Sequence, residues 1–115
     1  MEFENTNKLD AIDHVAIQVN NIQDSLNWYL NKFKCKEIYS DKTWAFIEFN
    51  NMKLALVTNK QHPNHFAILD NNLNQLLNPK KHRDGSISIY INDIDNNYIE
   101  LIKYKIDNNN KGKEK

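Results

Sequence analysis

Three residues of this chain could bind a divalent metal together: His14, His65 and Glu100. Two of them are related by a faint internal repeat, since Asp13-His14-Val15-Ala16-Ile17 recurs 51 residues later as Asn64-His65-Phe66-Ala67-Ile68. Two imidazoles and one carboxylate suit a divalent first-row metal and leave coordination positions for water or substrate. Such a metal could polarise a carbonyl, stabilise an enolate, activate water or bind dioxygen.

A second pair of segments extends the repeat. Lys53-Leu54-Ala55-Leu56-Val57 resembles Tyr98-Ile99-Glu100-Leu101-Ile102. The chain is therefore interpreted as two copies of one unit, each of which begins with a His-bearing strand and ends with an apolar strand. The second copy is shorter, because 41 residues separate His14 from Ala55 but only 35 separate His65 from Glu100.

Hydrophobic periodicity predicts the order β-α-β-β-β for the first module, at about 11–59. Its predicted strands are 12–19, 36–40, 44–49 and 52–58, and its helix is 22–33, with Asn20 or Asn21 as the N-cap. The second module, at about 64–106, has predicted strands at 65–69, 86–91 and 98–104 and at most a short helix at 72–77. We expect the abbreviation to fall mainly on the helix and second strand of this module.

These elements predict an α+β fold in which two βαβββ-type modules form a curved mixed sheet, shaped as a cup. Residues 11–106 are expected to form this single domain, with a flexible leader at 1–10 and a disordered tail at 107–115. Strand side chains alternate between faces. In the first strand, Val15 and Ile17 can pack under the helix, whereas His14 and Ala16 point to the opposite face.

The corresponding strands of the second module place His65 and Glu100 on that opposite face too. A simpler alternative is that His14 and His65 are structural histidines and that Glu100 is a solvated strand residue. The equivalent positions of the two histidines and the matching face of the glutamate favour the metal site.

The composition of the chain indicates which kinds of partner and which cellular location to expect. Fifteen basic and fifteen acidic residues cancel, so nothing favours binding to nucleic acid or to a membrane surface. The apolar runs are too short to span a bilayer, and the polar start of the chain is not that of a signal peptide. The single Cys35 allows no intramolecular disulfide and fits a reducing cytoplasm. We therefore expect a cytoplasmic protein that acts on a small molecule.

Four stretches of the chain resemble the vicinal oxygen chelate superfamily, which includes glyoxalase I, bleomycin-resistance proteins, fosfomycin-resistance enzymes, methylmalonyl-CoA epimerase and extradiol dioxygenases. They are 12–19, 25–29, 62–68 and 93–101, and the resemblance as a whole covers about 10–105. The last stretch is similar to the family's Asp-Pro-Asp-Gly-Asn turn before its ligand glutamate, with Ile94 and Asn96 in place of proline and glycine.

The resemblance implies that His14, His65 and Glu100 are metal ligands. The family's fourth ligand position falls on Ala55, which cannot coordinate a metal, and this departure argues against glyoxalase or epimerase activity. A set of two histidines and one glutamate resembles that of extradiol dioxygenases and fosfomycin thiol transferases. Bleomycin-type binders share the fold without a metal, so the fold alone does not imply catalysis.

Other residues are further candidates, with core packing or surface solvation as the alternative for each. They are Gln18, Glu48 and Tyr90 for catalysis, and Trp44, His82 and Arg83 for substrate binding. His62, three residues before His65, is expected to be exposed in the linker between the modules.

The sequence thus favours a small metal-dependent enzyme, dioxygenase-like if the metal is iron, in which the metal chelates vicinal oxygens of a small substrate. The ligand types tolerate Fe, Mn, Ni, Co or Zn. The alternatives are a metal-free protein that sequesters a small molecule and a thiol transferase of the fosfomycin-resistance type. A homodimer is expected, and the cup could form within one chain or between two.

Overall fold

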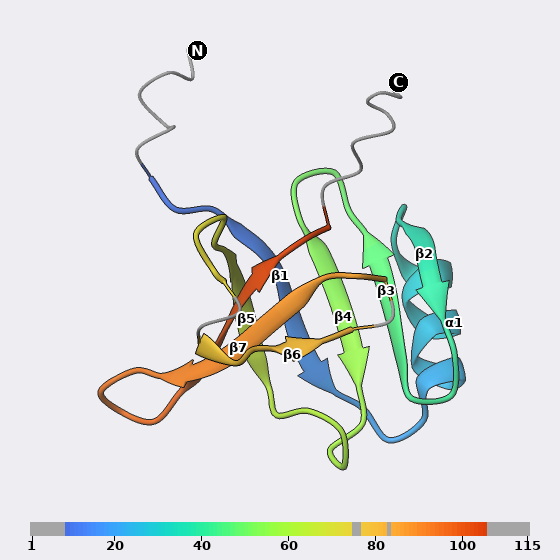
Figure 1. The fold of residues 1–115 in the computed structure, drawn as a ribbon. Helices are drawn as coiled ribbons and strands as arrows, with labels where there is room; N and C mark the ends of the chain where they lie inside the picture. The colour runs from blue at the N-terminus through green and yellow to red at the C-terminus, as the bar shows by residue number, and fades with distance from the viewer. Residues whose placement is uncertain (1–8, 75–76, 83, 106–115) are drawn as a thin grey trace.

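The first module is a helix packed on four strands. Its elements are β1 (Ile12–Gln18), α1 (Ile22–Lys32), β2 (Lys36–Ser40), β3 (Trp44–Glu48) and β4 (Lys53–Val57). Strands β2, β3 and β4 form an antiparallel meander, and β4 returns parallel to β1. The computed structural model describes residues 9–74, 77–82 and 84–105 (Figure 1). Most of the predicted leader, the whole predicted tail and the candidate Arg83 lie outside these ranges.

Helix α1 begins and ends where local chemistry requires. The side chain of Asn21 accepts a hydrogen bond from the backbone N–H of Asp24 at 2.9 Å, so Asn21 is the N-cap. At the other end Phe33 takes an extended backbone while its N–H still bonds to the carbonyl of Tyr29. Ile22 and Leu26 are the buried residues that fasten the helix to the sheet. No helix among the described residues is long and apolar enough to cross a membrane.

The second module is nearly all strand. It comprises β5 (His65–Leu69), β6 (Lys80–Lys81), β7 (Ile87–Asn92) and β8 (Tyr98–Lys103). Strand β6 is absent from the sequence-based prediction, because two lysines carry no strand pattern. Of the short helix suggested at 72–77, the described residues show a 3₁₀ turn at Leu77, whose N–H bonds to the Asn74 carbonyl at 3.3 Å. Before it a turn follows Asp70, and the N–H of Leu73 bonds to the Asp70 carbonyl. The middle of that segment, 75–76, lies outside the described residues.

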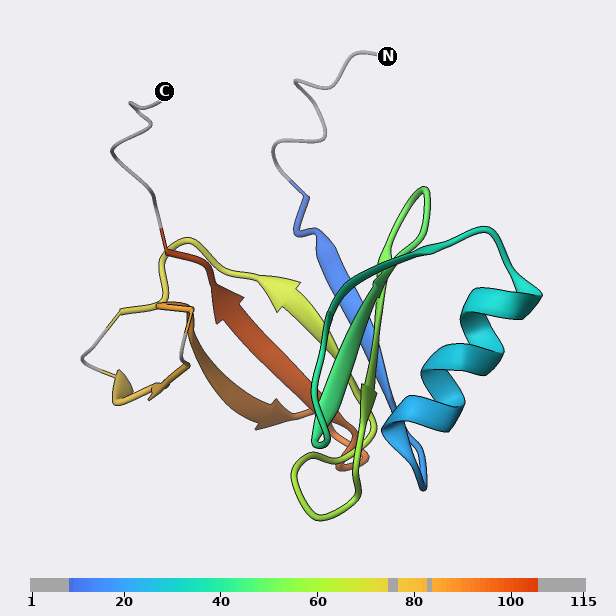
Figure 2. The ribbon, with the colours of Figure 1, turned by 90° about the vertical axis from the view of Figure 1, so that its right-hand side faces the viewer.

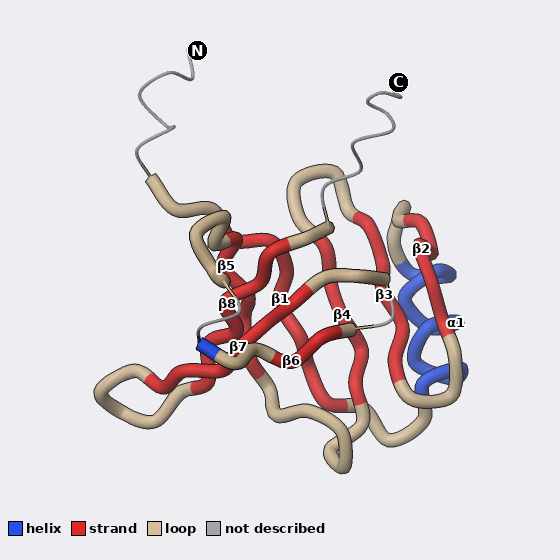
Figure 3. Tube along the Cα trace, in the orientation of Figure 1, coloured by secondary structure: helices blue, strands red, loops and turns tan. Residues whose placement is uncertain are grey.

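All eight strands join in one mixed sheet, in the order β2-β3-β4-β1-β5-β8-β7-β6. The modules meet at the antiparallel pair β1–β5 in its centre, and each module contributes one parallel pair, β1–β4 or β5–β8. The sheet curls into a half-barrel, with α1 outside the curve (Figures 2 and 3). The predicted α+β cup is confirmed, and it forms within one chain.

The strand registers reproduce the repeat seen in the sequence. Ala16 pairs with Ala55 between β1 and β4, and Ala67 pairs with Glu100 between β5 and β8. Ala16 and Ala67 each follow the histidine of their module by two residues. Ala55 is therefore the structural equivalent of Glu100, as the sequence alignment of the two modules predicts.

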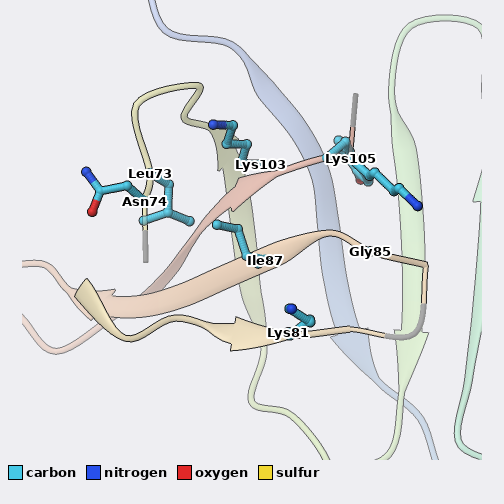
Figure 4. Close-up of a pocket in the computed structure, with 8 residues that line it drawn as sticks. Leu73, Asn74, Lys81, Gly85, Ile87, Lys103 and Lys105 are labelled. Atoms are coloured by element: carbon cyan, nitrogen blue, oxygen red, sulfur yellow. The ribbon is translucent and has the colours of Figure 1, made fainter. Parts of the chain in front are cut away.

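The outer faces of the two modules are covered differently. In the first module α1 seals a cluster of fully or nearly fully buried residues, Ile22, Leu26, Ala45, Ile47 and Leu56. In the second module Ile87 and Lys103, which are register partners, line a pocket of about 530 Å³ instead (Figure 4). Leu73 also lines this pocket, and the described residues of the second module form no α-helix to cover it.

Candidate metal centre

The structure brings together the three residues that the sequence singles out. The Nε2 atoms of His14 and His65 lie 3.3 and 3.2 Å from the same oxygen of Glu100, Oε1. One donor atom of each residue lies within 4.8 Å of the others. All three side chains are buried, with 6 to 8% of each residue exposed. The group therefore has the size and the shielding of a metal site.

Strand pairing explains why these side chains meet. His14 on β1 stands opposite Ala67 on β5, and Ala67 stands opposite Glu100 on β8. His65 lies on the same face of β5, two residues before Ala67. Because Ala67 is fully buried and has only a methyl side chain, it leaves room between the imidazole of His14 and the carboxylate of Glu100.

Each histidine uses its other ring nitrogen for support. His65 donates from Nδ1 to the carbonyl of Pro63 at 2.8 Å, and since a carbonyl can only accept, the proton must lie on Nδ1. His14 donates from Nδ1 to Oδ2 of Asp13 at 2.7 Å. Metal-binding histidines usually show this arrangement, because a bond at one nitrogen directs the lone pair of the other toward the metal.

The charges of the group are coupled. Burial raises the pKa of Glu100, but hydrogen bonds from His14, His65 and Ser88 outweigh burial and hold that pKa well below its usual range. Burial lowers the pKa of His14, but hydrogen bonds to Asp13 and Glu100 outweigh it and raise the pKa above 6.5. The site therefore favours positive charge beside the Glu100 carboxylate, which either an imidazolium or a divalent cation can supply.

The donor set fits a divalent first-row metal. Two imidazole nitrogens and one carboxylate on adjacent strands form the set that non-haem iron enzymes use, with open positions for other ligands. Ala55, the equivalent of Glu100 in the first module, is 4% exposed and offers no donor atom. Three protein ligands are therefore available among the described residues.

Tyr90 stands beside the group on β7. It is the register partner of Glu100, and its hydroxyl lies 2.8 Å from Nδ1 of His62 and 3.5 Å from the ring nitrogens of His65. Burial and the charge of Glu100 raise the pKa of Tyr90, so the phenol stays protonated at neutral pH. Tyr90 can therefore act as a hydrogen-bond donor in the cup.

His62 differs from the prediction that it is exposed. It is partly buried, and burial lowers its pKa, so the imidazole is neutral at neutral pH. The reason is local: the side-chain amide of Gln18 donates to the His62 carbonyl at 2.9 Å and draws the linker onto β1. The side chain of Gln18 thus holds the linker and is not engaged with the three candidate ligands. The place of His62 beside the group follows from its contact with Tyr90, which the sequence does not indicate.

The remaining candidates fall in three places. His82 bonds through Nε2 to the hydroxyl of Ser88 at 2.7 Å, and Ser88 in turn bonds to Glu100. Trp44 packs with a buried cluster on the cup face, and its ring centroid lies 5.3 Å from that of Phe46. Glu48, at the end of β3, is exposed and does not join the metal-ligand group.

Comparison with known proteins identifies the fold. No family model and no curated protein matches the chain. A hypothetical protein from Bacillus halodurans C-125 is similar in structure, with a TM-score of 0.71 and 18% identity over 87% of this chain and 98% of the other.

A second structural neighbour is methylmalonyl-CoA epimerase from Streptomyces coelicolor, in complex with 2-nitronate-propionyl-CoA. Its TM-score is 0.69, with 14% identity over 86% of this chain and 100% of the other. A third, described as NAD-dependent benzaldehyde dehydrogenase from Legionella pneumophila, has a TM-score of 0.64 and 17% identity over 80% and 98%. At such low identities the likeness shows the fold alone, and this chain shares the fold of these proteins. Methylmalonyl-CoA epimerase is one of the proteins that the sequence resemblance names, so the fold implied by that resemblance is confirmed.

Proposed function

We propose that the protein is a small metal-dependent enzyme of the vicinal oxygen chelate type. His14, His65 and Glu100 would hold a divalent metal, and a small substrate would bind it through two neighbouring oxygens. The observation that carries this proposal is the convergence of three buried donors on one point, with the Nδ1 atom of each histidine already engaged.

The residues around the group suggest how a substrate is held. A bound divalent metal would supply Lewis acidity to the substrate oxygens. Tyr90 would donate a hydrogen bond to one of those oxygens, and His62 would hold the Tyr90 hydroxyl in place. On the other side of the cup, Trp44 and Phe46 form an apolar wall that would contact the carbon skeleton and exclude water.

The residue at the family's fourth ligand position, Ala55, limits which reactions we propose. Ala55 provides no carboxylate, so we do not extend the activity of the epimerase neighbour to this chain. Two histidines and one carboxylate are the donor set of Fe(II) oxygenases, which makes a dioxygenase reaction the first to test. The thiol-transferase alternative uses the same ligands, and no described residue favours it over a dioxygenase.

A metal-free binding protein is the second candidate, and one observation favours it. The Nε2 atoms of His14 and His65 lie 3.3 and 3.2 Å from Oε1 of Glu100, so the three side chains can also satisfy one another as an ion-pair cluster. The same cup would then sequester a small apolar molecule against Trp44 and Phe46. Metal retention separates this candidate from the enzyme.

The function is tested by reconstitution with Fe(II), Mn, Ni, Co or Zn under reducing conditions, followed by three assays. Oxygen uptake with catechols tests the dioxygenase reaction, thiol-dependent loss of an epoxide tests the transferase, and fluorescence of Trp44 and Trp28 reports ligand binding. We expect turnover in the metal-loaded parent and none in Glu100→Gln, which keeps the shape of the side chain. Ligand binding that is indifferent to metal, with no turnover, would instead favour the binding protein.

Two further expectations belong to the proposal. We propose that the protein is cytoplasmic, and that it forms a homodimer in which each chain carries its own complete ligand set. Light scattering coupled to size-exclusion chromatography tests the oligomeric state, with a mass twice that of the 13.6 kDa chain expected.

A further inference from the structure

We propose that Asp13 is a positioning residue for His14, and that Tyr104 and Lys53 hold Asp13 in the orientation this role requires. The inference rests on the proposed metal site. In it, Asp13 keeps the proton of His14 on Nδ1, so that Nε2 offers its lone pair to the metal. Asp13 acts through His14 and is not itself a ligand.

The hydrogen bonds of Asp13 occupy both of its carboxylate oxygens. Oδ2 accepts from Nδ1 of His14 at 2.7 Å and from the Tyr104 hydroxyl at 2.5 Å, while Oδ1 lies 3.0 Å from Nζ of Lys53. The carboxylate is 7% exposed. Both oxygens of the Asp13 carboxylate are therefore held by contacts with other side chains.

Three separate parts of the sheet hold this anion in place. Asp13 belongs to β1, Lys53 begins β4, and Tyr104 directly follows β8. The ammonium of Lys53 also lies 5.0 Å from the ring centroids of both Phe46 and Tyr104, so the rings confine it. A carboxylate held in this way can fix the plane and the tautomer of the imidazole to which it bonds.

The second module has no such support, although the repeat supplies an equivalent position. Asn64 corresponds to Asp13, but its side-chain oxygen accepts from the backbone N–H of Gln18 at 2.7 Å and not from His65. His65 relies on the carbonyl of Pro63. Because a carboxylate raises the basicity of an imidazole ligand more than a neutral carbonyl does, His14 is the more strongly supported ligand. Asn64 is also a matched control for Asp13.

The test measures Zn²⁺ affinity by competition with a chromophoric chelator. We expect Asp13→Ala to weaken Zn²⁺ binding by about 10- to 100-fold, the usual effect of removing such a partner. Asn64→Ala is expected to bind Zn²⁺ like the parent. Lys53→Met removes one of the two groups that hold Asp13 but leaves the bond to His14, so it should weaken Zn²⁺ binding by less than Asp13→Ala does and should also lower the unfolding temperature.

A second readout needs no metal. Imidazole ¹⁵N shifts of the metal-free protein, at a pH where His14 is neutral, report which nitrogen carries the proton. The parent should show the proton on Nδ1, and Asp13→Ala should move it toward Nε2. A purely structural role for Asp13 would lower stability without this change, and folded Asp13→Ala that keeps the Nδ1 proton would contradict the inference.

The outcomes for Asp13 and for the metal site can be told apart. A parent protein without Zn²⁺ affinity would overturn both. A parent that binds Zn²⁺ while Asp13→Ala binds it equally well, or while Asn64→Ala loses as much affinity, would overturn the role of Asp13 and leave the metal site standing.

Discussion

The two modules share a strand register but differ in how they are packed. In the first, α1 seals the outer face of the sheet over Leu26, Ile47 and Leu56, which have no exposed surface. In the second, no α-helix among the described residues covers the outer face, and Ile91 there is 41% exposed. Yet the second module supplies two of the three candidate ligands, His65 and Glu100, and the first supplies only His14.

This difference indicates that the two modules contribute differently to stability and to the candidate metal site. The first module holds most of the buried apolar contacts that stabilise the fold, and through Asp13 it holds the more strongly supported histidine. The second module adds a second histidine and the carboxylate that balances both. Because the candidate ligands come from both modules, a metal bound there would link the less densely packed second module to the first module across the β1–β5 pair. It would thereby stabilise the folded chain.

The largest effect should come from the helix core. Leu26→Ala leaves a cavity between α1 and the sheet and should lower the free energy of unfolding by about 3 kcal/mol or more. Ile91→Ala, on the uncovered face of the second module, should cost less than about 1 kcal/mol because the side chain is already partly in water. Urea unfolding measures both. Equal losses would show that the two outer faces are packed alike.

Ala55→Glu tests the equivalence of Ala55 and Glu100. It places a carboxylate at the position of the first module that is equivalent to Glu100, so under the proposed metal site Zn²⁺ binding should tighten. In the metal-free protein the added charge is buried, and stability should fall by on the order of 2 kcal/mol. Calorimetric titration with Zn²⁺ and thermal unfolding give the two quantities. Unchanged Zn²⁺ affinity in a folded variant would mean that the register match does not place the new carboxylate in the site.

The pH dependence of stability should distinguish His14 from His62. The pKa of His14 is raised above 6.5, so its stabilising contribution to the metal-free protein is complete below 6.5 and is lost as pH rises through the raised pKa. The pKa of His62 is lowered by burial, so stability is lost as pH falls from 6.5 through the lowered pKa. His62→Gln should remove only the acid-side loss in urea titrations across pH.

Bound Zn²⁺ should oppose the loss of stability that the metal-free protein shows as pH rises. Metal binding requires neutral His14, so Zn²⁺ affinity should rise with pH over the same range in which the metal-free protein loses stability. Stability that falls on the alkaline side equally with and without saturating Zn²⁺ would argue that His14 is not a ligand.

The smallest expected loss of stability comes from the N-cap of α1. The described part of the second module has no corresponding α-helix. Asn21→Ala should lower the free energy of unfolding by about 1 kcal/mol because the N–H of Asp24 loses its acceptor. Asn20→Ala is the neighbouring control, since the cap bond is made by Asn21. Similar losses in both variants would show that the bond does not decide where the helix begins.

The sequence predicts the first module well because its signals are local. The spacing of Ile22, Leu26 and Tyr29 marks the helix, and alternation in β1 sets the face on which His14 lies. The internal repeat carries this information to the second module, which explains why the equivalence of Ala55 and Glu100 could be predicted without a structure.

Contacts between distant segments could not be predicted in this way. Asp13 and Tyr104 are 91 residues apart, and no periodicity relates a strand to the residue after another strand. The burial of His62 depends on the bond from Gln18, and β6 consists of two lysines that pair only because β7 lies beside them. These features arise from tertiary packing, so they appear only once the sheet order is known.

Metal content by elemental analysis, after tag-free purification, tests the central claim most directly. The parent should contain close to one divalent metal per chain, retained or regained on reconstitution, and His14→Ala and Glu100→Ala should lose it. Glu37→Ala, which removes an exposed carboxylate on β2, should keep it. A parent that holds no Fe, Mn, Ni, Co or Zn after reconstitution under reducing conditions would contradict the account and leave the protein as a metal-free small-molecule binder.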